Sequence, residues 1–385
     1  MFNFTYHNPT ELVFGRDSIA RLSVLLPAGV RVMMTYGGGS IRRNGVYDQV
    51  RDALQGWPLV EFGGIEPNPH YETCMKAVEQ VRAQNVQFLL AVGGGSVLDG
   101  TKLIAAASVF SGGDPWAMFY DWSLVPACPL PVGCVLTLPA TGSESNGGAV
   151  VTRAATQEKL FFTVPQSFPR FAILDPETTY SLPPRQTANG VVDAFVHVAE
   201  QYLTYPADTP LQDRQAESLL LTLLEEGPKA LRSPNDYAVR ANLMWCATQA
   251  LNGLIGCGVP QDWATHMIGH ELTALYGIDH GQSLAVVLPG VLRHEKARKR
   301  AKLLQMADRV WQLRDGDENA RVDQAIDRTE RFFQSLGVAT RLSDYQIPPD
   351  AASTVAQRLA DRNMKLGEHG DLSLTAVQEI LESRQ

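Results

Sequence analysis

The sequence lacks the features that several classes of protein require. Its five cysteines include no C-x-x-C pair, which is typical of reduced thiols and not of a disulfide framework. The longest apolar segment, residues 88–110, is interrupted by a run of three glycines at 93–95 and by Asp99 and Lys102, so it does not suit a membrane span. The N-terminus has no charged region followed by an apolar stretch, as a signal peptide would. We therefore expect a cytoplasmic protein.

An excess of basic residues is also missing. The chain has 33 Lys and Arg against 41 Asp and Glu, a net charge of −8, whereas nucleic-acid binding needs clustered cations. The one basic run, residues 293–302, falls in a helical pattern and predicts a solvated face. We expect neither nucleic acid nor a membrane as a partner. The length of 385 residues, with 45% hydrophobic residues, favours a globular chain of two domains.

The pattern of apolar residues changes half-way along the chain. Residues 30–36, 87–92 and 133–139 are short apolar runs without alternation, as expected of parallel strands buried on both faces, and residues 71–84 have helical spacing between the first two. This predicts a doubly wound α/β domain over residues 1–182. From residue 183 onward the periodicity is helical and no strand is evident, so residues 183–385 are expected to be all-helical. The Pro- and Thr-rich segment 173–186 suits a hinge.

Glycine-rich turns follow all three predicted strands, at residues 37–40, 93–96 and 139–148. At the carboxyl end of a parallel strand, such turns let backbone N–H groups approach an anion, and open α/β sheets bind ligands there. The dinucleotide pattern G-x-G-x-x-G fails at Arg42 and Leu98, and "GSVLDGTK" has the Thr and Lys of a P-loop in the wrong order. Three successive turns nevertheless predict a site for a nucleotide pyrophosphate.

The first of these turns indicates which nucleotide is bound. An NAD site usually has an acid after the strand, which accepts hydrogen bonds from the ribose 2′-hydroxyl. The segment "YGGGSIRRNG", residues 36–45, has no acid, but it has the hydroxyl of Ser40 and the cations Arg42 and Arg43. A 2′-phosphate is accommodated by such groups, so the sequence favours NADP over NAD.

Three of the eight histidines gather in the segment "HMIGHELTALYGIDHG". His266 and His270 are four residues apart on one predicted helix, as are Asp193 and His197 on another. A carboxylate in an apolar helix needs a compensating partner, and a divalent cation between two facing helices supplies one. The zinc-protease pattern H-E-x-x-H fails, because it would require histidine at Ala274.

Four segments together resemble a known family. "VGGGSVLDGTK", "TLPATGSESN", "LDPETTYSLPPRQTANGVVDAFVHVAEQY" and "HMIGHELTALYGIDHG" are similar to successive signatures of the iron-containing (group III) alcohol dehydrogenases, and in particular of the YqhD-type NADPH-dependent aldehyde reductases, also called NADP-dependent butanol dehydrogenases. The resemblance implies an α/β nucleotide-binding domain, an all-α domain of the dehydroquinate synthase-like fold, an active site in the cleft between them, and a homodimer.

The resemblance also implies roles for single residues. The expected ligands of one divalent metal, Zn²⁺ or Fe²⁺, are Asp193, His197, His266 and, from the loop that follows, His280. His270 is expected beside them as a catalytic residue that either supports the ligands or relays a proton. Glu271 and Asp262 receive no role beyond helix capping or packing around the site. The expected contacts of NADP(H) are Gly37, Gly38, Ser40, Asn68, Gly94, Gly95, Ser96, Asp99, Thr137, Thr141, Ser143, Asn146 and Lys159.

The function expected from these features is hydride transfer between NADPH and a short-chain aldehyde or primary alcohol. Enzymes of the same fold act on polar or phosphorylated substrates, as dehydroquinate synthase and glycerol-1-phosphate dehydrogenase do. They should need several cations near the metal, and few occur near these motifs. A metal-dependent hydrolase would leave the glycine turns unexplained, and a non-catalytic nucleotide-binding module would leave the metal ligands unexplained.

Overall fold

The computed structural model describes all 385 residues, which form two compact units. The α/β unit comprises residues 7–182 and 234–248, and the helical unit comprises residues 1–6, 183–233 and 249–385. The chain changes unit between residues 182 and 183, where the sequence predicts a domain boundary. The predicted division into 1–182 and 183–385 stays a prediction. In the structure, residues 1–6 belong to the helical unit and residues 234–248 to the α/β unit.

The α/β unit is built on a six-stranded sheet with the order β1-β8-β5-β4-β2-β3, and every pair of neighbours in it is parallel. The three predicted strands are confirmed as β2, β4 and β5, and the hairpin β6–β7 forms a separate antiparallel pair. The strands are β1 (Glu11–Phe14), β2 (Val32–Tyr36), β3 (Leu59–Phe62), β4 (Phe88–Gly94), β5 (Val132–Leu138), β6 (Gly148–Arg153), β7 (Glu158–Thr163) and β8 (Phe171–Leu174).

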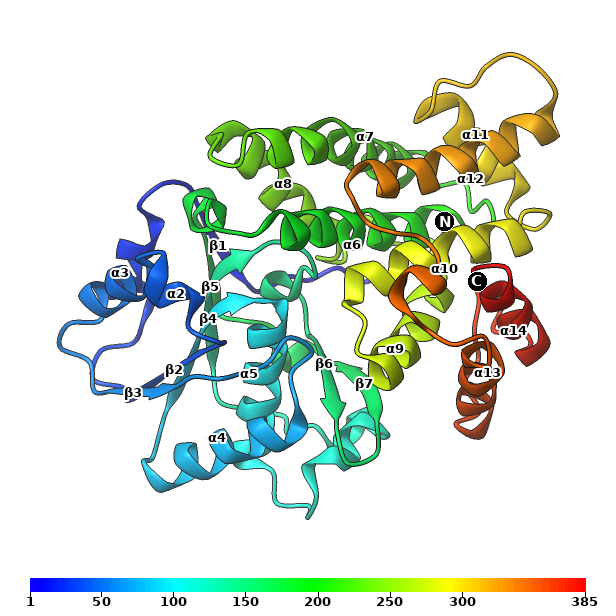
Figure 1. Ribbon diagram of the computed structural model, residues 1–385. Helices are drawn as coiled ribbons and strands as arrows, with labels where there is room; N and C mark the ends of the chain where they lie inside the picture. The colour runs from blue at the N-terminus through cyan, green and yellow to red at the C-terminus, as the bar shows by residue number, and fades with distance from the viewer. The chain divides into compact units, whose positions relative to one another are not determined.

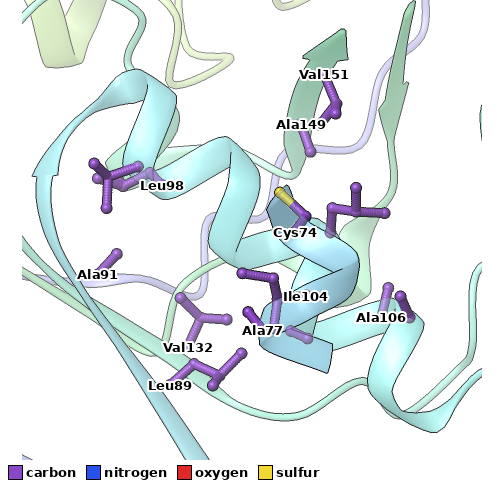
Figure 2. Packing of buried hydrophobic residues seen from close by; sticks show 14 of the residues in the cluster. Cys74, Ala77, Leu89, Ala91, Leu98, Ile104, Ala106, Val132, Ala149 and Val151 are labelled. Carbon is purple, nitrogen blue, oxygen red and sulfur yellow. The ribbon is translucent and has the colours of Figure 1, made fainter. Parts of the chain in front are cut away.

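Both faces of this sheet are covered, which explains why its strands are apolar without alternation. The helices of the unit are α1 (Leu22–Leu25), α2 (Ser40–Arg43), α3 (Val46–Ala53), α4 (Tyr71–Ala83) and α5 (Gly95–Val109). One core lies between the sheet and α3, and the other between the sheet and α4 and α5 (Figure 1). The second core includes Leu98 and Ile104 of α5, Leu89 of β4, and Cys74 and Ala77 of α4 (Figure 2).

Helix α8 (Tyr237–Ala250) follows the change to helical periodicity, yet most of it belongs to the α/β unit. Met244 is fully buried in the core that α4 and α5 form with the sheet. The hydroxyl of Thr248 donates a hydrogen bond of 2.6 Å to the buried carboxylate of Glu144. These two contacts hold the helix to the α/β unit.

The helical unit contains no strand, as predicted. Its helices are α6 (Pro184–Tyr202), α7 (Pro210–Arg232), α9 (Ala264–Tyr276), α10 (His280–His294), α11 (Arg300–Arg309), α12 (Glu318–Ser335), α13 (Ala351–Asp361) and α14 (Leu374–Glu382). A core of α9, α10, α13 and α14 supports the segment that carries the clustered histidines. The fold class of an α/β part with a parallel sheet and an all-α part is therefore confirmed. None of the helices combines the length and apolar character that crossing a membrane requires.

Candidate active site

Three histidines of the helical unit surround one carboxylate oxygen. Asp193 and His197 lie one turn apart on α6, His266 lies on α9, and His280 is the first residue of α10 and not part of the preceding loop as expected. The Nε2 atoms of His197, His266 and His280 lie 3.6, 3.7 and 3.6 Å from Oδ1 of Asp193. Asp193, His197 and His266 are almost fully buried. The structure thus brings all four predicted metal ligands together.

The spacing of these atoms suits a metal better than it suits hydrogen bonds. A distance of 3.6 Å is too long for an N–H···O bond. In a tetrahedral site the ligand–ligand distance is about 1.6 times the bond length, so bonds of about 2.0–2.2 Å place ligand atoms roughly 3.3–3.6 Å apart. Ligand atoms of Asp193, His266 and His280 all lie within 4.8 Å of one another. Nε2 of His266 is buried without a hydrogen-bond partner, as expected of an atom that binds a metal.

The electrostatics of the site favour a cation. Burial lowers the pKa of His197 to about 4, so its imidazole is neutral at pH 7, the form that binds metals. Burial also acts to lower the pKa of His266, but Glu200 and Asp193 outweigh it and raise that pKa to about 9. The two neighbouring carboxylates thus favour positive charge at His266.

Glu200 is a member of the site that the sequence analysis did not single out. Its Oε2 contacts Nδ1 of His266, and its Oε1 accepts a 2.7 Å hydrogen bond from the backbone N–H of Thr265. Glu200 is 4% exposed and lies on α6, three residues after His197 and seven after Asp193. These intervals place all three on one helix face, so the pattern that identified Asp193 and His197 extends to it.

His270 lies beside the ligands, one turn after His266 on α9. Its ring centroid is 5.3 Å from that of His280 and 6.3 Å from that of His266, and the residue is buried. Asp262 accepts a 2.9 Å hydrogen bond from the backbone N–H of Ala264 at the start of α9, in agreement with its expected capping role. Glu271, by contrast, does not cap a helix. It forms ion pairs with Arg358 and Arg362, at the end of α13.

The three glycine turns follow β2, β4 and β5, which are neighbours in the sheet. Because the strands are parallel, the turns gather at one sheet edge. A Cβ on Gly94 would lie 2.9 Å from Cβ of Leu138, and a Cβ on Gly95 would lie 2.4 Å from Oγ1 of Thr141. Glycine is thus required here because β5 and the turn after it approach β4 closely. Gly95 opens α5, whose first N–H groups point out of this edge.

Several predicted cofactor residues bind one another in this region. The hydroxyl of Ser96 accepts a 3.2 Å hydrogen bond from the backbone N–H of Asn68, whose side-chain oxygen accepts a 2.9 Å bond from Nζ of Lys159. Thr141 accepts a 3.2 Å bond from the N–H of Ser143. Asn68 therefore connects the start of α5 with β7, and the Thr141–Ser143 bond lies within the turn after β5. Thr137 lies buried near the end of β5.

Asp99, Ser143 and Asn146 turn inward, toward a buried lysine. Nζ of Lys102 donates to the carbonyl oxygens of Ser143, Asn146 and Gly148 at 2.7–2.9 Å, and the Ser143 hydroxyl donates to Asp99 at 2.6 Å. Burial, opposed by Asp99, lowers the pKa of Lys102 to about 8. These groups shape the turn after β5 from within.

The turn after β2 has an acid nearby after all, although not in its own segment. Gly39 has a φ of 88°, which favours glycine, and a Cβ on Gly38 would meet no atom within 4 Å. The guanidinium of Arg42 binds Glu61 of β3 at 2.9 Å and the Tyr36 hydroxyl at 2.8 Å. Arg42 is therefore held by protein groups.

Comparison with known proteins agrees with this arrangement. Residues 9–176 match the family model described as iron-containing alcohol dehydrogenase, and residues 187–384 match that of the C-terminal part of the Fe-containing alcohol dehydrogenase family. The chain belongs to the iron-containing alcohol dehydrogenase family. The resemblance stated from its sequence motifs is thereby confirmed.

Relatives within the family match over the whole chain. The NADPH-dependent aldehyde reductase YqhD of Escherichia coli strain K12 is 56% identical, and the match covers 100% of both chains. A probable NADH-dependent butanol dehydrogenase 1 of Bacillus subtilis strain 168 is 42% identical, again over 100% of both. The crystal structure of E. coli K-12 YqhD superposes with a TM-score of 0.99 at 55% identity, covering 100% of this chain and 99% of that one.

Proposed function

We propose that this iron-containing alcohol dehydrogenase is an NADPH-dependent aldehyde reductase, which reduces short-chain aldehydes to primary alcohols and catalyses the reverse oxidation. The observation that carries the proposal is the group of three imidazole nitrogens 3.6–3.7 Å from one oxygen of Asp193. It occurs in a chain 56% identical to an enzyme named as an NADPH-dependent aldehyde reductase. When bound, a divalent metal supplies a Lewis acid for a carbonyl oxygen, and NADPH supplies the hydride.

Four residues are proposed to hold the metal: Asp193, His197, His266 and His280. One carboxylate and three imidazoles suit iron and zinc alike, and we propose that either one is accepted. His270 is proposed to hold a proton next to the substrate oxygen and to deliver it as the alcohol forms, because it is buried with its ring centroid 5.3 Å from that of His280.

NADPH is proposed to bind at the carboxyl edge of β2, β4 and β5. The backbone of Gly94 and Gly95 and the hydroxyl of Ser96, at the start of α5, are proposed to bind the pyrophosphate, since a helix N-terminus favours an anion. Asn68, Lys159, Thr137 and Thr141 are proposed as further contacts. We propose that Asp99, Ser143 and Asn146 act mainly by shaping the turn. The side chains of Ser143 and Asn146 bind Lys102, and that of Asp99 binds the Ser143 hydroxyl and the backbone N–H of Val150.

The 2′-phosphate of NADPH is proposed to lie against the turn after β2. Gly37 and Gly38 leave room for it, and Ser40 and nearby N–H groups are its proposed donors. Arg43 is exposed and forms no ion pair, so we propose it as the cation that meets the phosphate. Arg42 is bound by Glu61 and is not needed for this purpose. We further propose a cytoplasmic homodimer.

The proposal is tested by following NADPH absorbance with the purified chain and a short-chain aldehyde such as butanal. We expect NADPH consumption that a chelator abolishes and that added Zn²⁺ or Fe²⁺ restores, and a much lower rate with NADH. The absence of aldehyde-dependent NADPH consumption by protein that contains stoichiometric metal would overturn the proposed function.

A further inference from the structure

We propose that Glu200 is a positioning residue of the metal centre, which fixes the orientation of His266 and supplies the second negative charge that a buried divalent cation needs. This inference rests on the proposed ligand set. Glu200 does not touch the substrate or the metal in this role. It acts through His266, whose ring it contacts.

The first argument is the direction of the imidazole ring. Oε2 of Glu200 contacts Nδ1 of His266, so Nδ1 carries the proton and Nε2 is left as the ligand atom. Nε2 is the atom that lies 3.7 Å from Oδ1 of Asp193 and has no hydrogen-bond partner. The carboxylate thereby selects the tautomer and the ring orientation that metal binding requires.

The second argument is how firmly the carboxylate itself is held. Oε1 of Glu200 accepts hydrogen bonds from the backbone N–H groups of Thr265, at 2.7 Å, and His266, at 3.4 Å. Both belong to the first turn of α9, whose N–H groups have no partner within the helix. The backbone oxygen of Glu200 also accepts a 2.8 Å bond from the N–H of Asp262. One residue of α6 thus both caps α9 and orients the histidine on it.

The third argument is charge. Among the four proposed ligands only Asp193 is an anion, so it balances half the charge of a divalent cation. An unbalanced charge is costly in a buried site. Glu200 is 4% exposed and is ion-paired with no Lys or Arg, and its one charged contact is with His266. With Glu200 ionised, the two carboxylates neutralise the metal.

The test compares metal binding in three variants of the full-length protein. Apoprotein is titrated with Zn²⁺ alone, in competition with a chromophoric chelator. For Glu200→Gln, we expect affinity to fall by about 10–100-fold, the usual cost of losing a carboxylate behind a metal-bound histidine. Glu217→Gln is the matched control, because Glu217 is 7% exposed and pairs with Tyr202, Gln305 and Arg309 instead. Its Zn²⁺ affinity should equal that of the wild type.

The third variant, His266→Ala, separates this inference from the proposed function. If Glu200→Gln binds Zn²⁺ as tightly as the wild type while His266→Ala does not, the role of Glu200 is overturned and the ligand set stands. If His266→Ala also binds normally, the ligand set itself is wrong.

A measurement on the wild type keeps the inference testable if Glu200→Gln does not fold. Nitrogen NMR of protein labelled at histidine reports which ring nitrogen carries the proton, with His266 assigned by its loss in His266→Ala. We expect a proton on Nδ1 of His266 in the Zn²⁺-loaded enzyme, and a proton on Nε2 there would overturn the inference.

Discussion

Lys102 donates hydrogen bonds to both the carbonyl oxygen and the hydroxyl of Ser143, at 2.7 and 2.8 Å. The same nitrogen reaches the carbonyl oxygens of Asn146 and Gly148, and the lysine is 1% exposed. An ammonium group has three N–H donors and no acceptor, so it suits a shell of oxygens as a bound cation would. The shape of the turn after β5 depends on this one side chain.

We predict that Lys102→Met weakens NADPH binding by about 10- to 150-fold, since one hydrogen bond of a charged group is worth about 1.5–3 kcal/mol. Because the change takes this donor away from the carbonyl oxygens of Ser143, Asn146 and Gly148, the circular dichroism spectrum of the variant is first compared with that of the wild type. Fluorescence titration with NADPH measures the effect. Wild-type affinity in Lys102→Met would show that the turn keeps its shape without the ammonium.

The pKa of Lys102 predicts that NADPH binding depends on pH. Burial lowers the pKa of Lys102 to about 8, so raising the pH through 8 converts the ammonium to an amine whose lone pair faces carbonyl oxygens. The dissociation constant of NADPH should therefore rise above pH 8 in the wild type. In Lys102→Met it should be weak at every pH and lack this rise, which distinguishes Lys102 from other titrating groups.

The metal site predicts loss of metal without loss of fold. His266→Ala or Asp193→Ala removes one of four ligands, so we expect little bound metal and nearly no turnover, with an unchanged circular dichroism spectrum. Elemental analysis measures the metal. His294→Ala is the control, because His294 pairs with Glu295 and Glu379 and should keep both metal and activity. Stoichiometric metal with normal activity in His266→Ala would exclude His266 as a ligand.

Gly95→Val is predicted to abolish NADPH binding. The Cβ of the new side chain would lie 2.4–2.5 Å from Oγ1 and Cγ2 of Thr141, too close for any real contact, so the turn after β5 must move away from the start of α5. Two proposed parts of the nucleotide site are thereby separated. Affinity is measured by NADPH titration, and an unchanged value would argue against this edge of the sheet as the nucleotide site.

Helical periodicity in the sequence was enough to predict part of the metal site. Asp193 and His197 share one helix face, as do His266 and His270, and these intervals do not depend on how the helices pack. Extending the same count by three residues reaches Glu200, so that residue was within reach of the sequence. The approach of α9 to α6 was not, because it depends on the tertiary fold.

The β strands likewise include some that the sequence predicts and some that it does not. Buried runs such as residues 88–92 are conspicuous because both faces of the sheet are covered. The strands β1, β3 and β8 have only four residues each, and so they leave little pattern. The pairing of Arg42 with Glu61 depends on the register of β2 and β3, in which Met34 lies opposite Glu61. For this reason, the sequence could suggest Arg42 as a phosphate partner but could not show what occupies it.

The buried pair of Glu330 and Arg384 predicts a contribution to stability near the end of the chain. Arg384 is 1% exposed and also donates to the carbonyl oxygens of Val286 and Thr340, and Arg293 binds the other oxygen of Glu330 at 2.7 Å. We predict that Arg384→Met lowers the free energy of unfolding by about 3–5 kcal/mol, because it leaves a buried carboxylate with fewer partners. Urea unfolding measures this. Arg314→Met, which removes an exposed pair with Asp308, should change it by less than about 1 kcal/mol.

The same ion pair predicts that the stability of the protein depends on pH in the acid range. Although burial opposes the shift, Arg384 and Arg293 lower the pKa of Glu330 to about 2. A carboxyl group whose pKa is lower in the folded state stabilises the protein above its unfolded pKa, and this stabilisation is lost as the pH falls from about 4.5 toward 2. In Arg384→Met, the free energy of unfolding should fall less over this pH range. Equal acid dependence in both proteins would mean that Arg384 does not hold the Glu330 charge.

The preference for NADPH over NADH should depend on the turn after β2. The structure gives the two arginines of this turn different surroundings. A Cβ on Gly37 would lie 3.2 Å from the backbone oxygen of Ile65, so aspartate fits after a shift of a few tenths of an ångström. Its carboxylate would accept from the 2′-hydroxyl of NADH and repel the 2′-phosphate of NADPH. Gly37→Asp should therefore lower kcat/KM for NADPH far more than for NADH. Equal losses for both nucleotides would show that this turn does not read the 2′ position.

Arg43→Ala should raise KM for NADPH alone, by roughly tenfold, since one charge-assisted hydrogen bond is worth about 1.5–3 kcal/mol and exposure reduces that value. The loss should shrink as salt is added. Arg42→Ala serves as the control on the neighbouring residue, because Arg42 is bound to Glu61 and Tyr36 and packs 3.9 Å from the ring centre of Tyr47. It should leave the preference for NADPH over NADH near that of the wild type. A larger loss of that preference in Arg42→Ala than in Arg43→Ala would mean that Arg42 leaves Glu61 when NADPH binds, and the assignment of the phosphate to Arg43 would then be wrong.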